Sequence, residues 1–392
     1  MKEQKAILEA YDRADKTRRM ALATVVRVRG SSYRSPGARM LITDDGTWTG
    51  SISGGCLEGD ALRKARQVMT TNTPVAVSYD TSEESNQNLG ISLGCNGIID
   101  VLIEPVTCQH PHDPVTLFRN VVAEQQPVAL ATVFSNGSLQ GEKMLIRSDG
   151  ECIVRLSSAA LNKKVSDDLV RCLETHRSET KAYLIGREII EVFIEVIQPT
   201  VSLLIFGAGF DARPVCQLAK SLGWEVSVTD ECVAHIAPLF FPNADKLSLC
   251  NREFVSRDFD ITPYTACVLM SHNYAYDRDV LKKLLTTPTP YIGILGPRKR
   301  FDKMLNEYVL QGLTLTADDH QRIHSPIGLD IGAETPDEIA LSIIAEIQSR
   351  FTGRPGGFLK DRPTPIHQRD DESDQVIKQV YREGWIGTRV NL

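Results

Sequence analysis

Two cysteines of this chain stand in glycine-rich turns, where a thiol is accessible to a ligand. Cys56 follows Gly54 and Gly55 and comes just before a helical pattern over residues 57–69, and Cys95 stands in a second glycine-framed turn. A thiol at the start of a helix suits thiolate chemistry or the ligation of a soft metal ion. We therefore predict Cys56 and Cys95 as metal ligands, with Gly54 and Gly55 where the ligand approaches the backbone. The alternative, a small buried apolar side chain, stays open for both cysteines.

A second candidate site is a glycine turn between an apolar segment and a helical pattern. A buried strand is predicted over residues 201–206, Gly207 and Gly209 follow at once, and a helix is predicted over residues 213–222. A further strand leads to Asp230, where a dinucleotide-binding fold has the acid that binds a ribose hydroxyl. We predict a Rossmann-type unit in which Gly207, Gly209 and Asp230 bind a cofactor. A purely architectural turn is the alternative.

His272 and Arg298 each follow a further predicted strand of the same region. Polar residues at the carboxyl ends of parallel strands line the usual ligand crevice of a doubly wound sheet. Both are therefore predicted to face the cofactor, and Arg298 suits an anionic group of it. The alternatives are a loop hydrogen bond for His272 and a solvated basic turn for Arg298, and solvation is the expectation for Lys299 and Arg300.

The remaining elements predict an α/β fold class. Hairpin turns and β-branched strands indicate a mixed α+β domain over residues 1–197, and alternating strands and helices indicate a Rossmann-like doubly wound parallel sheet over residues 198–354. Thr335 and Glu338 predict a capping box at the start of the last long helix. Residues 355–392 are rich in glycine, proline and charge, which predicts a loosely ordered tail. No internal repeat is expected.

Composition narrows the classes of function. The chain has 392 residues, 42% of them hydrophobic, and a formal net charge of -6, which offers no basic face for nucleic acid. It has no apolar run long enough to span a bilayer, and its first residues lack the apolar core of a signal peptide. Nine cysteines without a CxxC pair fit a reducing compartment, and no zinc-site spacing is present. We expect a cytoplasmic protein that forms a homodimer through an edge strand.

Several segments resemble the XdhC/CoxI family, whose members accompany molybdenum hydroxylases: SPGARMLI, DGTWTGSISGGCLEGD, LGCNGIIDVLIEP, LLIFGAGFDARPVCQLAKSLGWEV, MSHNYAYDRDVLKKLL, YIGILGPRKR and SPIGLDIGAETPDEIALSIIAEI. The resemblance implies a protein that binds the molybdenum cofactor (molybdopterin) and protects it during sulfuration by a cysteine desulfurase. It also implies delivery of the cofactor to a xanthine dehydrogenase-like hydroxylase. The family's cysteines correspond to Cys56 and Cys95, and its Rossmann glycines to Gly207 and Gly209. Phe210 stands where the family's GAGH pattern has a histidine.

Two other classes of function stay open. An NAD(P)-dependent oxidoreductase would use His272 as an acid or base and Asp230 on the adenosine ribose. A non-enzymatic scaffold would use the glycine loops only to shape a surface for the hydroxylase or the desulfurase. A carrier without catalytic residues is the favoured interpretation, because a plain dehydrogenase has no use for the SGGCLE segment.

Overall fold

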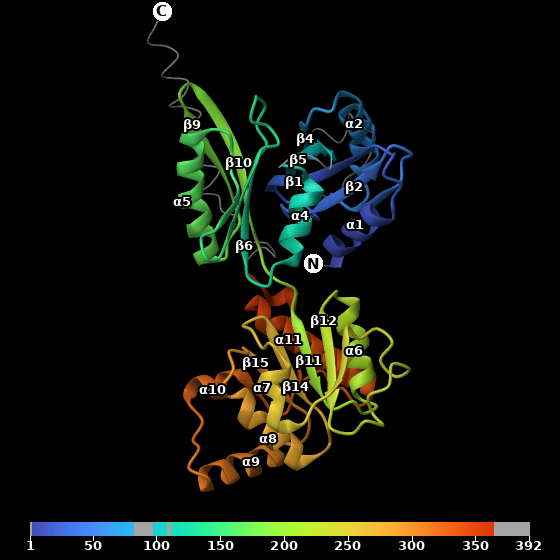
Figure 1. Cartoon of the computed structure of the whole chain (residues 1–392), viewed down its shortest axis with the longest axis vertical. Coiled ribbons are helices and arrows are strands. Elements are labelled where there is room, and N and C mark those ends of the chain that lie inside the picture. The colour runs from blue at the N-terminus through green and yellow to red at the C-terminus, as the bar shows by residue number, and fades with distance from the viewer. Residues whose placement is uncertain (1, 82–96, 108–109, 111, 364–392) are drawn as a thin grey trace, which may run out of the picture. The chain divides into compact units, whose positions relative to one another are not determined.

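The computed structural model describes residues 2–81, 97–107, 110 and 112–363. The described chain forms two compact units, one over residues 3–199 and one over residues 200–363 (Figure 1). The first unit contains two antiparallel sheets, and the second contains a parallel sheet with helices on both faces. The predicted fold class, a Rossmann-like sheet preceded by a mixed α+β region, is therefore confirmed.

The first antiparallel sheet has five strands in the order β3-β2-β1-β5-β4. Its elements and accompanying helices are α1 (Lys2–Arg13), β1 (Met20–Gly30), β2 (Arg39–Thr43), β3 (Trp48–Gly50), α2 (Glu58–Thr71), β4 (Val75–Asp80) and β5 (Gly97–Pro105). Ala61 and Ala65 of α2 are buried in one core with Ala23 and Val25 of β1. The first seven residues of β1 are all buried. Both faces of this strand are therefore covered, by α2 on one side, and on the other by residues of α1, α4 (Pro114–Ala123) and the second sheet.

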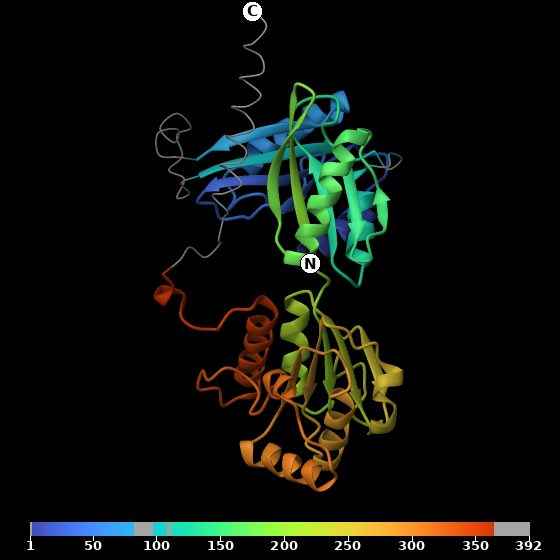
Figure 2. The ribbon, with the colours of Figure 1, turned by 90° about the vertical axis from the view of Figure 1, so that its left-hand side faces the viewer.

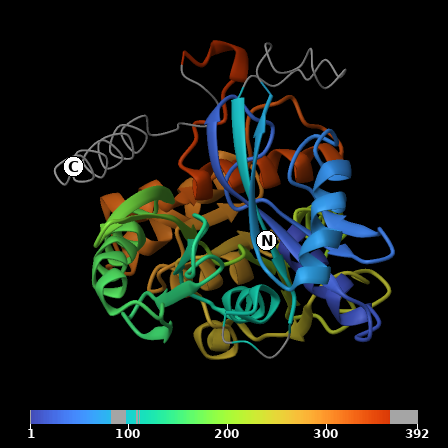
Figure 3. The ribbon, with the colours of Figure 1, turned by 90° about the horizontal axis from the view of Figure 1, so that it is seen from above.

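The second antiparallel sheet has the order β8-β7-β6-β10-β9. Its elements are α4 (Pro114–Ala123), β6 (Val128–Val133), β7 (Lys143–Arg147), β8 (Cys152–Val154), α5 (Ala159–Thr175), β9 (Glu179–Ile185) and β10 (Glu188–Ile197). Leu161 and Val165 of α5 are buried with Ala129 and Ala131 of β6. Helices α2 and α5 thus lie on opposite outer sides of the unit, with the two sheets between them (Figure 3).

The two sheets are two copies of one module. In each copy the third strand is followed by a helix, and the strands have the same order within the sheet. The registers also agree, since Ala21 pairs with Ile42 and Ala129 with Ile146. Three pairs of segments are alike in sequence: 20–26 with 128–134, 37–46 with 141–150, and 98–105 with 189–196. The chain therefore contains an internal repeat, and the expectation of none is wrong. The repeat gives a weak signal in the sequence because the matching segments are short and the connections between them differ in length.

Charged residues at equivalent positions form reciprocal ion pairs between the facing sides of the two sheets. Arg39 of β2 binds both carboxylate oxygens of Glu195 in β10, with 3.0 Å between Nη1 and Oε1. Its counterpart Lys143 of β7 binds Glu104 of β5, the counterpart of Glu195. None of the four side chains is more than 10% exposed. Each copy therefore gives one cation and one carboxylate to the interface.

The interface contains a third cation, Arg27 of β1. Its guanidinium binds Asp100 in the first copy, with 2.6 Å between Nε and Oδ2, and Glu191 in the second. These two acids occupy equivalent positions in β5 and β10. The apolar part of the interface is a cluster with two residues from each copy: Val26, Leu102, Phe134 and Phe193. Each module therefore buries its inner face against the other copy.

The parallel sheet of the second unit, whose strands run from yellow-green to orange in Figure 2, has the order β13-β12-β11-β14-β15-β16. This is the Rossmann order. Its elements are β11 (Ser202–Phe206), α6 (Ala212–Ser221), β12 (Glu225–Asp230), β13 (Lys246–Leu249), η1 (Arg252–Phe254), α7 (Val255–Asp258), β14 (Thr265–Leu269), α8 (Tyr274–Leu284), β15 (Tyr291–Ile294), α9 (Arg298–Leu310), α10 (Ala317–Arg322), β16 (Ile323–His324), α11 (Pro336–Thr352) and η2 (Leu359–Asp361). Helices α6 and α11 pack on one face, and α7, α8 and α9 on the other.

The helix α11 begins with the predicted capping box. Thr335 Oγ1 accepts a hydrogen bond from Glu338 N at 3.4 Å, and Glu338 Oε2 accepts one from Thr335 N at 2.9 Å. This reciprocal bonding fixes the first turn of the helix. Within the described ranges, no helix combines the length and apolar character that crossing a membrane requires.

Candidate functional site

The connection from β3 to α2 folds around the hydroxyl of Ser53. The backbone N–H groups of Gly55, Cys56 and Leu57 all donate to Ser53 Oγ, each at 3.1 Å. The hydroxyl itself donates its proton to Glu58, the first residue of α2. Three donors at the start of a helix are thereby gathered on one side-chain oxygen. This bonding gives the Gly-Gly-Cys turn a defined shape.

The carboxylate of Glu58 connects the two ends of this loop. Oε1 accepts from Ser51 Oγ at 2.8 Å and from Ser53 N at 2.9 Å, and Oε2 accepts from Leu57 N at 3.1 Å. Burial by itself would raise the pKa of Glu58, but hydrogen bonds from Ser53, Ser51 and the backbone outweigh it and hold the pKa below its usual value. The carboxylate of Glu58 is therefore ionised at neutral pH, although only 5% of this residue's surface is exposed.

Cys56 has a half-buried thiol that faces the same hydroxyl, with Sγ 3.5 Å from Ser53 Oγ. Gly55 has a φ of +110°, which favours glycine, and a Cβ built there would meet no heavy atom within 4 Å. A Cβ on Gly54 would stand 3.8 Å from the ring of Tyr33. The backbone beside the thiol is therefore open to a ligand at Gly55. Binding of a cofactor at Cys56, Gly54 and Gly55 stays a prediction.

Sequence reasoning missed Ser53 and Glu58, although a signal for them was present. Both flank the Gly-Gly-Cys turn, and serine and glutamate are the residue types that bind free N–H groups at a helix N-terminus. It also missed Tyr33, because the contact between its ring and Gly54 joins two connections that are separate in the sequence.

Cys95 lies outside the described residues, so its predicted role as a metal ligand stays a prediction. The connection that contains it leaves β4 after Asp80 and enters β5 at Gly97. Thr81 closes the base of this connection, since its N and Oγ1 donate to Gly97 O at 2.9 Å and 2.7 Å. Among the described residues, no group of three or more His, Cys, Asp or Glu side chains is placed to hold a metal ion.

The two glycines of the Rossmann turn have different surroundings. Gly207 has a φ of +116°, and a Cβ there would come within 2.5 Å of the backbone of Ser271 at the end of β14. The first glycine is therefore required by close packing of two backbone segments. A Cβ on Gly209 would stand 3.8 Å from His272 Cδ2, which is an ordinary contact. Gly209 is thus not required by packing, and the ligand contacts of both glycines stay predictions.

Asp230 ends β12, as predicted, and its carboxylate is bonded within the protein. Oδ2 accepts from Ala208 N at 2.9 Å and Oδ1 from Cys232 N at 2.8 Å, and His235 Nδ1 lies 3.1 Å from Oδ2. The residue is 6% exposed. Asp230 therefore holds the glycine turn at the end of β12, and its predicted contact with a cofactor stays a prediction.

Two further residues were predicted to face the cofactor, His272 and Arg298, and their contacts differ. His272 is exposed, has a φ of +57°, and has Nε2 at 3.2 Å from Asp211 Oδ2. Arg298 is exposed at the first residue of α9. Arg300, expected to be solvated, is instead paired with the fully buried Asp277 at 2.6 Å, so that expectation is wrong. Burial raises the pKa of Asp277 above its usual value, although Ser271 and Arg300 act against this.

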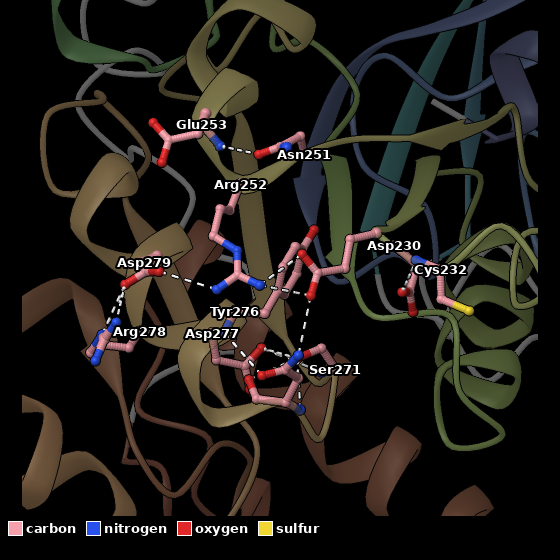
Figure 4. A network of polar contacts seen from close by, with 12 residues as sticks. Asp230, Cys232, Asn251, Arg252, Glu253, Ser271, Tyr276, Asp277, Arg278 and Asp279 are labelled. Atoms are coloured by element: carbon pink, nitrogen blue, oxygen red, sulfur yellow. Dashed lines mark hydrogen bonds and ion pairs between the residues drawn. The ribbon is translucent and has the colours of Figure 1, made fainter.

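A network of polar contacts surrounds Arg252 in the same unit (Figure 4). Its Nη2 donates to both carboxylate oxygens of Glu231 at 2.8 Å, and its Nη1 donates to Asp279 Oδ2 at 3.2 Å. Asn273 Nδ2 also donates to Glu231, at 3.1 Å. The charge of Arg252 is matched by two carboxylates, so the network connects η1, α8 and the end of β12. Sequence reasoning missed Arg252, because it lies in a short turn without periodicity.

A pocket of about 280 Å³ lies between the two copies of the module. Its wall includes Glu104 from the first copy, Glu142 from the second, and His110 and His112 from the segment between them. The sequence from Gln109 to Asp113 is polar and contains a proline, which predicts solvated linker residues for both histidines, and for His112 this prediction is wrong. Its ring is partly buried and its Nδ1 accepts from Lys143 N at 3.1 Å. Burial lowers the pKa of His112 below its usual value.

The fold and the segment from Ser53 to Glu58, the cysteine loop, together define a class of protein. Its members have a duplicated antiparallel module that carries the cysteine loop in its first copy, followed by a Rossmann-type unit. The XdhC and CoxI family matches residues 14–80 and 121–183, one segment in each copy of the module. The XdhC Rossmann domain matches residues 203–347. The chain belongs to the XdhC and CoxI family, as the resemblance predicted.

Known relatives and a solved structure agree with this assignment. A probable xanthine dehydrogenase subunit of Bacillus subtilis (strain 168) is 31% identical over 346 residues, which cover 87% of this chain and 94% of the relative. The molybdenum cofactor insertion chaperone PaoD of Escherichia coli (strain K12) is 25% identical over 328 residues, covering 84% and 82%. A crystal structure described as a xanthine dehydrogenase from Bacillus halodurans has a TM-score of 0.72 and 29% identity, covering 93% of this chain and 98% of that one.

Proposed function

We propose that this chain is an accessory protein that binds the molybdenum cofactor and delivers it to a xanthine dehydrogenase-like molybdenum hydroxylase. Membership of the family supports the proposal, as does the similarity to a molybdenum cofactor insertion chaperone. The observation that carries it is the loop from Ser53 to Glu58. There a thiol, open backbone at a glycine and a helix start are held in one fixed turn.

The residues of this loop fit the chemistry of the cargo. Molybdopterin carries a dithiolene, a phosphate and a fused pterin ring, so its carrier needs a soft donor beside backbone that a bulky ligand can approach. Cys56 supplies the soft donor. Gly55 leaves the space beside it open. Ser53 and Glu58 hold the turn in place, so that little ordering of the loop is needed when the cargo binds. Cys95 is proposed as a second thiolate.

The proposal includes protection of the cofactor while a cysteine desulfurase supplies its sulfur. The half-buried position of Cys56 supports this part, because a partly covered thiol, and a group bound to it, are less accessible to oxidants than an exposed one. In this proposal the chain contributes binding and shielding, and no residue of it is assigned a catalytic role.

Transfer to the hydroxylase tests the proposal. The chain is loaded with molybdenum cofactor without oxygen, freed of excess cofactor and mixed with cofactor-free hydroxylase. We expect molybdenum and pterin to move to the hydroxylase and to activate it faster than the same amount of free cofactor. Equal activation by free cofactor, with no metal leaving the chain, would show that delivery is not its function.

A further inference from the structure

The duplication provides an internal reference for the cysteine loop, because the second copy has the same fold without it. Where the first copy has the segment Ser53 to Glu58, the second has 157–162, SSAALN, which lacks the glycines and the cysteine. In that copy Asn162 binds the backbone of Leu156 instead, through Oδ1 at 2.9 Å and Nδ2 at 2.6 Å. The two copies therefore differ at this connection while sharing the fold.

Two other connections also differ between the copies. Between equivalent positions of the first two strands, the first copy has residues 27–36 and the second has residues 135–140. Between the last two strands, the first copy has residues 81–96, while the second has only Gly186 and Arg187. The first copy is thus longer at both of these places.

All three divergent connections begin or end at one end of the first sheet. Gly30, the last residue of β1, pairs with Gly97, the first residue of β5. Asp80, the last residue of β4, pairs with Ile98, and Gly50 at the end of β3 pairs with Met40 near the start of β2. Since these strands are antiparallel in turn, these strand ends lie at the same edge. The three connections that differ between the copies therefore share one edge of the first sheet, and connections on a rigid scaffold commonly carry binding residues.

At this edge an aromatic ring lies exposed beside the cysteine loop. Tyr33, in the connection from β1 to β2, is 72% exposed. A Cβ on Gly54 would stand 3.8 Å from its Cγ and 3.9 Å from its Cδ1, so the ring lies against the backbone of the loop. The corresponding connection of the second copy, residues 135–140, contains no aromatic residue. The ring therefore belongs, like Cys56, to the part of the first copy that differs from the second copy.

We propose that Tyr33 is the residue on which the pterin ring of the cofactor stacks. This inference rests on the proposed function and adds a specific binding residue to it. A pterin is a planar, fused heterocycle, and such rings bind proteins by stacking on exposed aromatic faces. The ring is held beside Gly54, next to the thiol proposed for the metal end of the same ligand. A ligand with a metal at one end and a flat ring at the other thus has a contact for each.

Three variants test this proposal: Tyr33→Leu, which removes the aromatic face, Tyr33→Phe, which keeps it, and Phe358→Leu as a matched control. Phe358 is 77% exposed and lies in the other unit. The dissociation constant for molybdenum cofactor is measured by equilibrium dialysis without oxygen. We expect Tyr33→Leu to weaken binding by about 5-fold to about 150-fold, the range for loss of one stacking contact. Tyr33→Phe and Phe358→Leu should bind as the wild type does.

The outcomes separate this proposal from the proposed function. If Tyr33→Leu binds the cofactor as tightly as the wild type does, while Cys56→Ala fails to bind it, only the stacking role is overturned. Equal weakening in Tyr33→Leu and Tyr33→Phe would also overturn it, because the aromatic face would not be the cause. Absence of binding by the wild type would overturn the proposed function itself. Thermal unfolding of each variant should match the wild type, since the ring is exposed.

Discussion

Arg39 and Glu195 form an ion pair between the two copies of the module, and their side chains are only 5% and 10% exposed. Lys143 and Glu104 form the second pair at the equivalent positions. Here the second copy gives the cation and the first copy gives the carboxylate. Two copies of a module that exchange the same contacts have the arrangement of a symmetric dimer joined into one chain. Within this interface the ion pairs are buried, so each cation depends on the carboxylate of the other copy for its charged partner.

Glu195→Gln and Glu104→Gln should each destabilise the first unit strongly. Each substitution leaves a buried cation without its charged partner, and such a change costs about 3–5 kcal/mol. Unfolding by urea, followed by circular dichroism, measures the loss. Glu9→Gln is the matched control. The side chains of Glu9 and Arg13, which form an ion pair, are 62% and 80% exposed, so this pair should contribute less than about 1 kcal/mol. Equal effects of buried and exposed substitutions would contradict the role given to these pairs.

Ser53→Ala should reduce cofactor retention, and Ser157→Ala should not. Without Ser53 Oγ, three backbone N–H groups of the cysteine loop lose their common acceptor. We expect a stability loss of about 1 kcal/mol, because only the N–H group of Leu57 among the three donors is buried. Ser157 is the equivalent residue of the second copy and donates to Glu142 at 2.7 Å. Molybdenum retained after desalting is measured for both variants, and a larger loss with Ser157→Ala would contradict the assignment.

The ionisation of Glu58 should make the stability of the chain depend on pH in the acid range. Its pKa in the folded chain lies below the ordinary value of 4.5. The carboxylate therefore contributes stability that is fully present above about pH 4.5 and is lost as the pH falls through the lower folded-state pKa. Denaturant unfolding at a series of pH values should show the wild type approaching Glu58→Gln at low pH. A constant difference between them at every pH would contradict this.

The two glycines of the Rossmann turn should respond differently to alanine. Gly207→Ala forces a Cβ to within 2.5 Å of the backbone of Ser271, at a φ that disfavours alanine, so it should lower the unfolding temperature markedly. Gly209→Ala meets only His272 Cδ2 at 3.8 Å and should keep the fold. If the turn binds an anion, Gly209→Ala should weaken that binding at an unchanged unfolding temperature. Isothermal titration with NADH and with inorganic phosphate measures it, and unchanged binding would make the turn architectural.

The Rossmann unit was predictable because its signals are local. A strand, two glycines, a helix and a strand that ends in Asp230 follow one another within a short stretch, and the capping box at Thr335 lies within four residues. The ion pairs of Arg252 and Arg300 were not predictable, because their partners depend on which strand ends lie side by side. Nothing in the basic run at Arg298 distinguishes the residue that turns inward from the two that face solvent.

The duplication could have been found in the sequence. MALATVV at residues 20–26 matches VALATVF at 128–134, and MLI follows a glycine and a cation in both copies. The pattern was missed because the copies differ most in the connections, which are the segments that carry the candidate site. For the same reason the repeat would not have identified Ser53 or Glu58. Their role depends on hydrogen bonds within a turn that the second copy lacks.

The most direct test of the central claim is retention of molybdenum cofactor by the wild type, Cys56→Ala and Cys152→Ala. Cys152 is a half-buried free thiol in the second copy and is the matched control. Each protein is incubated with the cofactor without oxygen and desalted, and its molybdenum and pterin are measured. We predict near-stoichiometric retention by the wild type and by Cys152→Ala, and loss of retention by Cys56→Ala. Retention by Cys56→Ala equal to that of the wild type would contradict the role proposed for this thiol.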